Sequence, residues 1–254
     1  MKAFVSFVLL VLCSGLAGAQ IKKPEPPAVK VPFARSLQAV VVTTKDWPAV
    51  AGTARLFERK NPNSDWKSKG DSFPIVVGRS GLAWGDYDLR PSAAVKYKKE
   101  GDGAAPAGLF PLPFAFGSGT KPEAVEMPYT KLDSLTECVD DVGSSFYNRI
   151  VNRLQVGNFD WKSSEKMLAV GEEYELGIFV AYNSYPIEKD RGSCIFLHVW
   201  KDATNATSGC TAMERTNLER IVAWASPSKN PYLVQMPESE YNSNRKKWKL
   251  PKIK

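Results

Sequence analysis

His198 and Cys210 are the two side chains in this sequence best suited to covalent chemistry. His198 is the only histidine in the chain, and Cys210 follows it closely, at the end of the run Ser208-Gly209-Cys210. A cysteine thiolate is a strong nucleophile, and a histidine accepts and returns a proton near neutral pH. Acyl transfer through a cysteine thioester needs both groups and also hydrogen-bond donors for the developing oxyanion. The residue types therefore predict a cysteine nucleophile with a histidine base.

The segments that carry these two residues are predicted to be a strand and a helix. Residues 194–200 are β-branched and aromatic and almost continuously apolar, as expected of a strand buried on both faces. After Cys210, apolar residues recur at helical spacing up to position 225, and Thr211 to Glu214 has the form of a capping box. We therefore expect a helix over 211–225 that begins at Cys210 or Thr211.

A helix that begins at the cysteine has a chemical consequence. Its unpaired N–H groups and the positive end of its dipole favour the Cys210 thiolate, so we expect a low pKa and reaction with iodoacetamide below neutral pH. Gly209 allows a tight backbone in which its own amide and that of Cys210 converge on a carbonyl oxygen, with Ser208 as a further donor. The alternative is a histidine with satisfied hydrogen bonds in the core and an inert buried cysteine.

Two stretches of sequence resemble the active-site signature of a known enzyme family. Residues 192–198 (GSCIFLH) with 207–210 (TSGC), and residues 101–110 (GDGAAPAGLF), are similar to the L,D-transpeptidase (YkuD-like) family, which remodels bacterial peptidoglycan. The resemblance extends from about residue 37 to residue 237. It implies a mostly β fold, an L,D-transpeptidase-like β-sandwich with a few short helices, one of them starting at the catalytic cysteine.

The resemblance also implies a reaction. Cys210, helped by His198, attacks the carbonyl between the third and fourth residues of a peptidoglycan tetrapeptide stem and releases D-alanine. Transfer of the acyl group to an amine on a neighbouring stem makes a 3-3 crosslink. Transfer to water makes the same site a hydrolase, either an L,D-carboxypeptidase or an enzyme that releases proteins linked to peptidoglycan. A non-catalytic wall-binding module is a third alternative.

Substrate-binding residues follow from the resemblance and from its departures. Ser208 stands where many members have a second histidine, and Ala212 stands where many have an arginine. We expect Arg215, about one helical turn further on, to bind a substrate carboxylate in place of that arginine. A tyrosine on a strand and an Asn-Arg pair beside a turn are also common structural residues. Three further candidate substrate contacts are Tyr182, Asn148 and Arg149.

Three cysteines remain when the N-terminal segment that contains Cys13 is removed. An odd count in an oxidising compartment suggests one disulfide and one free thiol. A bridge between Cys138 and Cys194 leaves Cys210 free to react. In the alternative, Cys194 is a small strand residue and Cys138 lines the cleft. The sequence leaves both open.

The two ends of the chain differ in composition from its middle. Residues 1–19 contain an apolar run and a small-residue cleavage site, which predict a secretory signal peptide and a mature protein in the periplasm or cell envelope. Residues 20–35 are proline-rich and predict a linker, and residues 36–240 form one catalytic domain. Residues 241–254 form a basic tail that is either solvated or held on an anionic envelope surface.

Composition narrows the choice of partners and cofactors. The chain has 34 Lys and Arg against 27 Asp and Glu and carries no motif that reads RNA or DNA, so no nucleic-acid partner is expected. A single histidine without a paired-cysteine motif argues against zinc, and the chemistry needs no metal or organic cofactor. We expect a monomer that binds peptidoglycan stem peptides.

The positions of further strands can also be predicted from the sequence. We expect strands at 37–44, 53–58, 73–77, 174–182, 194–200 and 232–236, and an ordered loop at 104–121.

Overall fold

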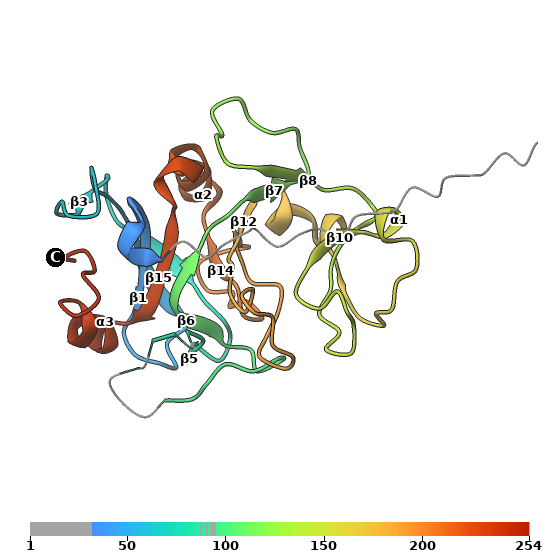
Figure 1. Cartoon of the computed structure of the whole chain (residues 1–254), viewed down its shortest axis with the longest axis horizontal. Helices are drawn as coiled ribbons and strands as arrows, with labels where there is room; N and C mark the ends of the chain where they lie inside the picture. Colours follow the sequence, from blue (N-terminus) through green and yellow to red (C-terminus); the bar gives the residue numbers. More distant parts are fainter. Residues whose placement is uncertain (1–31, 87, 90, 92–94, 254) are drawn as a thin grey trace, which may run out of the picture.

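The fold is organised around a large mixed β-sheet (Figure 1). The computed structural model describes residues 32–86, 88–89, 91 and 95–253, so the predicted signal peptide at 1–19 and most of the predicted linker at 20–35 lie outside the described residues. Neighbouring strands of the sheet are, in order, β5 (Leu82–Trp84), β6 (Ala105–Pro111), β15 (Tyr232–Pro237), β1 (Gln38–Thr44), β2 (Ala51–Glu58), β4 (Phe73–Val76), β14 (Thr211–Met213), β13 (Phe196–Val199), β12 (Gly177–Phe179), β7 (Ala115–Gly117) and β8 (Tyr129–Lys131), and β3 (Lys67–Ser68) pairs with β2.

A smaller sheet and several short helices complete the described chain. The small sheet has the order β10 (Ile150–Asn152), β9 (Thr136–Cys138) and β11 (Glu165–Lys166). The helices are η1 (Phe33–Arg35), α1 (Arg153–Val156), η2 (Met167–Tyr174), α2 (Arg215–Trp224), η3 (Pro227–Lys229) and α3 (Glu238–Asn244). Among the described residues, no helix combines the length and the apolar character needed to cross a membrane. The predicted mostly β fold with a few short helices is confirmed.

β1 lies at the centre of the larger hydrophobic core. All of its residues are buried, and it pairs with β15 in parallel on one side and with β2 in antiparallel fashion on the other. Its consecutive valines favour an extended backbone because β-branched side chains pack well on a pleated surface. The strands predicted at 37–44, 53–58, 73–77 and 232–236 correspond to β1, β2, β4 and β15.

β13 separates two hydrophobic clusters and thereby positions His198. Leu197 and Val199 pack in the larger cluster, whereas Phe196 packs in a second cluster that contains Cys210. Successive side chains of a strand point to opposite faces, so His198 shares the face of Phe196. The prediction of a strand buried on both faces is confirmed.

The residues after Cys210 form a strand, and the predicted start of the helix is wrong. Thr211–Met213 is fully buried as β14, which pairs in parallel with β13 and in antiparallel fashion with β4. Helix α2 begins only at Arg215, and Glu214 caps it without a side-chain hydrogen bond. Burial between two strands outweighs the local helix signal. Cys210 therefore does not lie at a helix N-terminus.

The segment 104–121, predicted to be a loop, contains two strands. β6 pairs with β5 and β15, and β7 pairs with β12 and β8. Gly108 in β6 has φ of 148°, and a Cβ atom there would lie 2.4 Å from the Cβ of Asp86. A glycine in a strand marks such a close approach, and this glycine and the prolines of the segment concealed the strands from sequence analysis.

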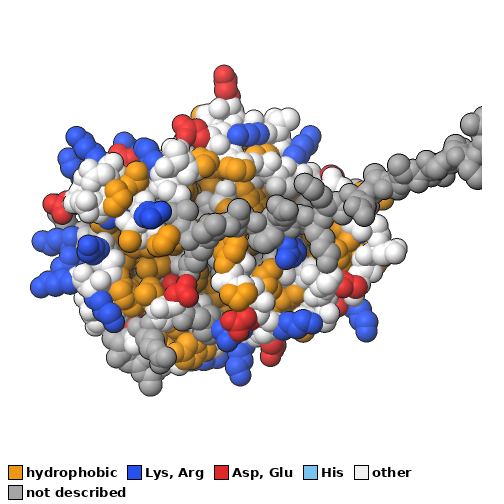
Figure 2. Space-filling model, viewed as in Figure 1, with side chains coloured by type: hydrophobic (Ala, Val, Ile, Leu, Met, Phe, Trp, Pro, Cys, Tyr) orange, Lys and Arg blue, Asp and Glu red, His pale blue; other side chains and the backbone are white. Residues whose placement is uncertain are grey.

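The C-terminal residues pack against the domain and do not extend from it as a tail. The Tyr241 hydroxyl in α3 is buried and donates to the Pro251 carbonyl at 2.7 Å, and Leu250 is buried in the larger core. The ring of Trp248 lies 6.0 Å from that of Trp84. Lysines at 246, 247, 249 and 252 remain exposed, and Figure 2 shows Lys and Arg side chains gathered at this end of the molecule. Contact with an anionic surface stays a prediction.

Because Trp248 is partly buried against Trp84, we expect Trp248→Ala to lower the free energy of unfolding by about 2 kcal/mol. Guanidinium titration followed by circular dichroism measures this change. The exposed Lys247→Ala is the matched control, with an expected change within about 0.5 kcal/mol. Equal stabilities of the two variants would show that the packing of Trp248 on Trp84 contributes nothing to the stability of the fold.

Candidate active site

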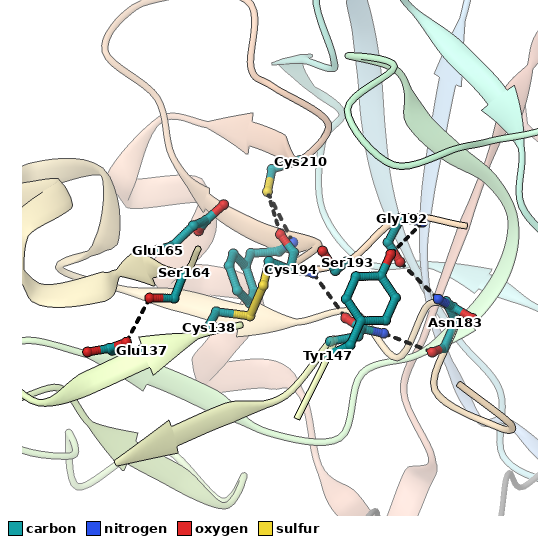
Figure 3. The surroundings of a disulfide bond; sticks show 12 residues. Glu137, Cys138, Tyr147, Ser164, Glu165, Asn183, Gly192, Ser193, Cys194 and Cys210 are labelled. Atoms are coloured by element: carbon teal, nitrogen blue, oxygen red, sulfur yellow. Dashed lines mark hydrogen bonds between the residues drawn. A yellow bond between two sulfur atoms is a disulfide. The ribbon is translucent and has the colours of Figure 1, made fainter. Parts of the chain in front are cut away.

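The sulfur of Cys210 lies against the backbone of the segment that leads into β13. The amide of Phe196 donates a hydrogen bond to Sγ at 3.3 Å, and the thiol donates to the carbonyl oxygen of Cys194 at 3.5 Å (Figure 3). Cys210 is only 7% exposed. The reactive atom is therefore desolvated, with a backbone N–H already directed at it.

This environment keeps the thiol protonated. Burial raises the pKa of Cys210 far above its usual range, and the negative charge of Glu165 adds to the effect. The Phe196 amide and the positive charge of Lys98 act in the opposite direction but are outweighed. The prediction of a low thiol pKa is thus wrong for this structure, because it assumed a helix terminus that is absent. A nearby base must remove the proton.

His198 lies on the same face of the sheet as Cys210. β13 and β14 pair Leu197 with Thr211 in parallel register, so His198 is displaced from Cys210 by two residues along the neighbouring strand. Its Nδ1 lies 2.7 Å from the carbonyl oxygen of Val199. Because a carbonyl only accepts hydrogen bonds, Nδ1 carries the hydrogen and Nε2 is the nitrogen with a lone pair. The orienting carbonyl thus comes from the next residue in the chain.

The His198 ring is neutral at physiological pH. Burial lowers its pKa to about 4, and the hydrogen bond to the Val199 carbonyl opposes this shift only in part. The ring of Tyr174 packs against it with centroids 5.4 Å apart. A neutral imidazole whose Nε2 carries the lone pair is the form that accepts a proton from a thiol.

The turn before Cys210 is held by Thr207 and Gly209. The Thr207 hydroxyl donates to the Cys210 carbonyl at 2.7 Å and accepts the Gly209 amide at 3.1 Å. Gly209 has φ of 155°, and a Cβ atom there would lie 3.2 Å from the Ala104 carbonyl oxygen, so glycine is favoured at this position. The Gly209 amide, predicted to bind an oxyanion, is thus engaged within the turn, and Ser208 is exposed at its tip.

A disulfide joins Cys138 of β9 to Cys194, which agrees with the first of the two cysteine hypotheses and leaves Cys210 as the free cysteine of the described residues. Asn148 supports the backbone at Cys194. Its amide group donates to the carbonyls of Tyr182 and Asn183 at 2.9 and 2.8 Å, and its Oδ1 accepts the Cys194 amide at 3.0 Å. Asn148 therefore positions the backbone that contacts the sulfur.

The other three predicted substrate contacts, Tyr182, Arg215 and Arg149, lie in different surroundings. Tyr182 is buried, and its hydroxyl donates to the Arg191 carbonyl, so it packs within the core. Arg215 forms an ion pair with Glu175 at the surface. Arg149 lines a large cavity together with Tyr147, Tyr185 and Lys189.

The cavity has a volume of about 600 Å³, within the usual range of ligand sites. Arg149 and Lys189 supply positive charge to its wall, and Tyr147 and Tyr185 supply aromatic surface. The Tyr147 hydroxyl donates to Glu100 and accepts the Gly192 amide at 3.0 Å, which links this wall to the segment that leads to Cys194 (Figure 3). Such a lining suits a polar anionic ligand.

Sequence analysis missed Glu165 and Tyr174. The Tyr174 hydroxyl donates to Glu165 Oε2 at 2.7 Å, and Tyr174 belongs to the same hydrophobic cluster as Cys210. Position 174 was predicted to begin a strand, but it ends η2, and β12 begins only at Gly177. No local motif marks either residue, because both approach the site from a segment distant in sequence.

We expect the NMR resonances of His198, the only histidine, to titrate in the folded protein with a pKa of about 4, and with an ordinary value near 6.5 in urea. Between these pH values only the unfolded chain binds the proton. The His198 contribution to stability is therefore present above about pH 6.5 and is lost as pH falls toward 4, by about 3 kcal/mol in total. A folded-state pKa above 6 would show that the ring is solvated.

The comparison with protein families adds a finding that is independent of this geometry. The L,D-transpeptidase catalytic domain model (YkuD) matches residues 53–234, a range that contains His198, Cys210 and the small sheet. No curated protein matches the chain. The matched range covers well over half of the 254 residues. The chain therefore belongs to the YkuD family of L,D-transpeptidase catalytic domains.

Proposed function

We propose that this protein is a secreted, cysteine-dependent L,D-transpeptidase that acts on peptidoglycan stem peptides in the periplasm or cell envelope. The observation that carries the proposal is the free thiol of Cys210 on the same face of adjacent strands as the neutral, oriented imidazole of His198. Family membership supports the reaction class. Peptidoglycan lies outside the cytoplasm, which agrees with the signal peptide predicted at 1–19.

In the first half of the proposed reaction, Cys210 becomes acylated. His198 helps to take the thiol proton, and the sulfur attacks the carbonyl between the third and fourth residues of a tetrapeptide stem. The amide of Cys210, with Ser208 and with the Gly209 amide once it leaves Thr207, stabilises the oxyanion. His198 then returns a proton to the departing D-alanine amine as the C–N bond breaks, and a thioester remains.

In the second half, an amine on a neighbouring stem attacks the thioester carbonyl. His198, neutral again, takes a proton from the attacking amine as the new amide bond forms and the C–S bond breaks, and it returns that proton to the departing Cys210 sulfur. The products are a 3-3 crosslink and the free thiol. Water in place of the amine would yield a free tripeptide carboxylate. Exclusion of water from the acyl-enzyme decides between these products.

The cavity beside Tyr147 is the site we propose for the anionic groups of the stem. Arg149 and Lys189 line it, and a guanidinium pairs well with a carboxylate through two parallel hydrogen bonds. Arg215, the residue expected from sequence for this role, is already paired with Glu175. Tyr147, in the cavity wall, accepts a hydrogen bond from the Gly192 amide, and two residues further on the disulfide-bonded Cys194 contacts the sulfur of Cys210.

Incubation of the mature protein with disaccharide-tetrapeptide muropeptides tests the reaction. We expect mass spectrometry to detect crosslinked dimers together with released D-alanine, and neither product with Cys210→Ala, because the nucleophile is gone. Tripeptide monomers without dimers would assign the protein as a hydrolase. Absence of any Cys210-dependent product would contradict the enzymatic proposal and favour a wall-binding module.

We expect Arg149→Gln to raise KM for the muropeptide about tenfold with little change in kcat, because a charge-assisted contact to a substrate carboxylate is lost. Steady-state kinetics measures the two constants. Arg215→Gln is the matched control: it removes an exposed ion pair, and we expect KM within about twofold of the wild-type value. The cavity assignment fails if Arg215→Gln has the larger effect on KM.

A further inference from the structure

The backbone that receives the Cys210 sulfur has an unfavourable conformation just before β13. Cys194, whose carbonyl accepts from the thiol, has φ of 55°, in the left-handed region that residues other than glycine rarely adopt. Gly192, two residues earlier, has φ of 106°. A residue persists in such a conformation only where the surrounding structure holds it there. The position of the groups that contact the sulfur therefore depends on what fixes residues 192–194.

The last residue of this segment is held by contacts described above, and the middle residue has a partner of its own. The disulfide and the Asn148 side chain fix Cys194. Ser193 is buried, and its hydroxyl donates to Glu100 Oε2 at 2.7 Å. Glu100 lies in a segment far from Ser193 in the sequence, so this hydrogen bond is a tertiary contact that ties residues 192–194 to another part of the fold.

Glu100 accepts two hydroxyl hydrogens through one oxygen. The Tyr147 hydroxyl also donates to Glu100 Oε2, and the same hydroxyl accepts the Gly192 amide at 3.0 Å. Burial, together with the hydrogen bond and charge of Glu100, raises the pKa of Tyr147 well above its usual range, so the phenol keeps its hydrogen and donates it. Figure 3 shows the Tyr147 ring beside Gly192 and Ser193. Glu100 is thus joined to two consecutive residues of the segment.

The backbone that carries Glu100 is itself firmly held. The Glu100 amide donates to the Asp190 carbonyl at 3.0 Å. On either side of Glu100 in the sequence, Lys98 and Asp102 form a buried ion pair at 2.8 Å. Asp102 also accepts the Ala104 amide at 2.9 Å. A carboxylate on a fixed backbone holds its partners at a fixed place.

We propose that Glu100 is a positioning residue for the nucleophile and that it acts through Tyr147 and Ser193. By accepting both hydroxyl hydrogens, it holds the backbone of residues 192–194 in the conformation that receives the Cys210 sulfur. The role requires a hydrogen-bond acceptor at Oε2 and not a negative charge, so the amide oxygen of a glutamine can fill it. The inference rests on the proposed function, in which Cys210 is the nucleophile, but its first test needs no peptidoglycan.

Amide hydrogen exchange, followed by NMR, tests the positioning without substrate. The Phe196 amide donates to the Cys210 sulfur, and its exchange rate is divided by that of Val41 in the buried strand β1 so that a change in global stability cancels. We expect Glu100→Ala to raise this ratio about tenfold, because the backbone before Phe196 is no longer fixed. Glu100→Gln should keep the ratio within about threefold of the wild-type value.

Muropeptide kinetics gives a second readout. We expect Glu100→Ala to lower kcat about tenfold with KM within about threefold of the wild-type value, because a displaced nucleophile slows the chemical step. Glu100→Gln should restore kcat to within about threefold. Ser193→Ala removes one of the two donors to Glu100 and should give an intermediate kcat. Glu123→Ala, a change at an exposed glutamate, is the control and should match the wild type.

Two results would overturn the proposal. One is an exchange ratio that Glu100→Ala leaves unchanged. The other is a Glu100→Gln protein that behaves like Glu100→Ala, because the charge and not the hydrogen bonds would then matter. If Glu100→Ala does not fold, Ser193→Ala decides: a ratio raised about threefold supports the proposal, and an unchanged ratio contradicts it. Absence of Cys210-dependent turnover in the wild type, with the exchange ratios as expected, would contradict the proposed function alone.

Discussion

The contact between the Cys210 sulfur and the backbone of residues 194–196 is the interaction on which the site depends. One amide donates to the sulfur and one carbonyl accepts from it, so the nucleophile is held by main-chain groups and not by side chains. The position of that backbone is set by the Cys138–Cys194 disulfide and by Asn148. The same contact desolvates the thiol, which raises its pKa and makes a base necessary.

The need for a base explains why both faces of β13 matter. Leu197 and Val199 fasten the strand to the larger core, and this leaves Phe196 and His198 on the face that carries Cys210. The opposite wall of that face comes from η2 and the small sheet, which contribute Tyr174 and Glu165. A neutral histidine and a carboxyl group with a raised pKa thus lie near one buried thiol. In this buried site of low dielectric constant, a charge on any of these groups shifts the pKa of the others by more than it would in water.

Several elements could be predicted from sequence because their signal is local. β1 carries a run of β-branched residues, and β2, β4 and β15 carry short segments rich in apolar residues. The strand of His198 was expected to be buried on both faces. The helix expected at Cys210 could not be placed correctly, because Thr211–Met213 is drawn into the sheet by pairing with two strands. The strands in the Gly- and Pro-rich segment and the packing of Trp248 escaped prediction for the same reason, since each depends on partners far away in the chain.

The sequence by itself determined which chemical groups are available: one histidine, a cysteine after a glycine, and, apart from Cys13 in the predicted signal peptide, two further cysteines able to pair. Residue identity and short spacing were enough for that, and they pointed to the family. Only the tertiary structure decided the pKa values of those groups and which residues surround them. The pKa of Cys210 depends on burial and on a charge at Glu165, and that of His198 depends on burial and on the carbonyl of Val199. Burial and the distance between charges are properties of packed elements, so the order of adjacent residues does not contain them.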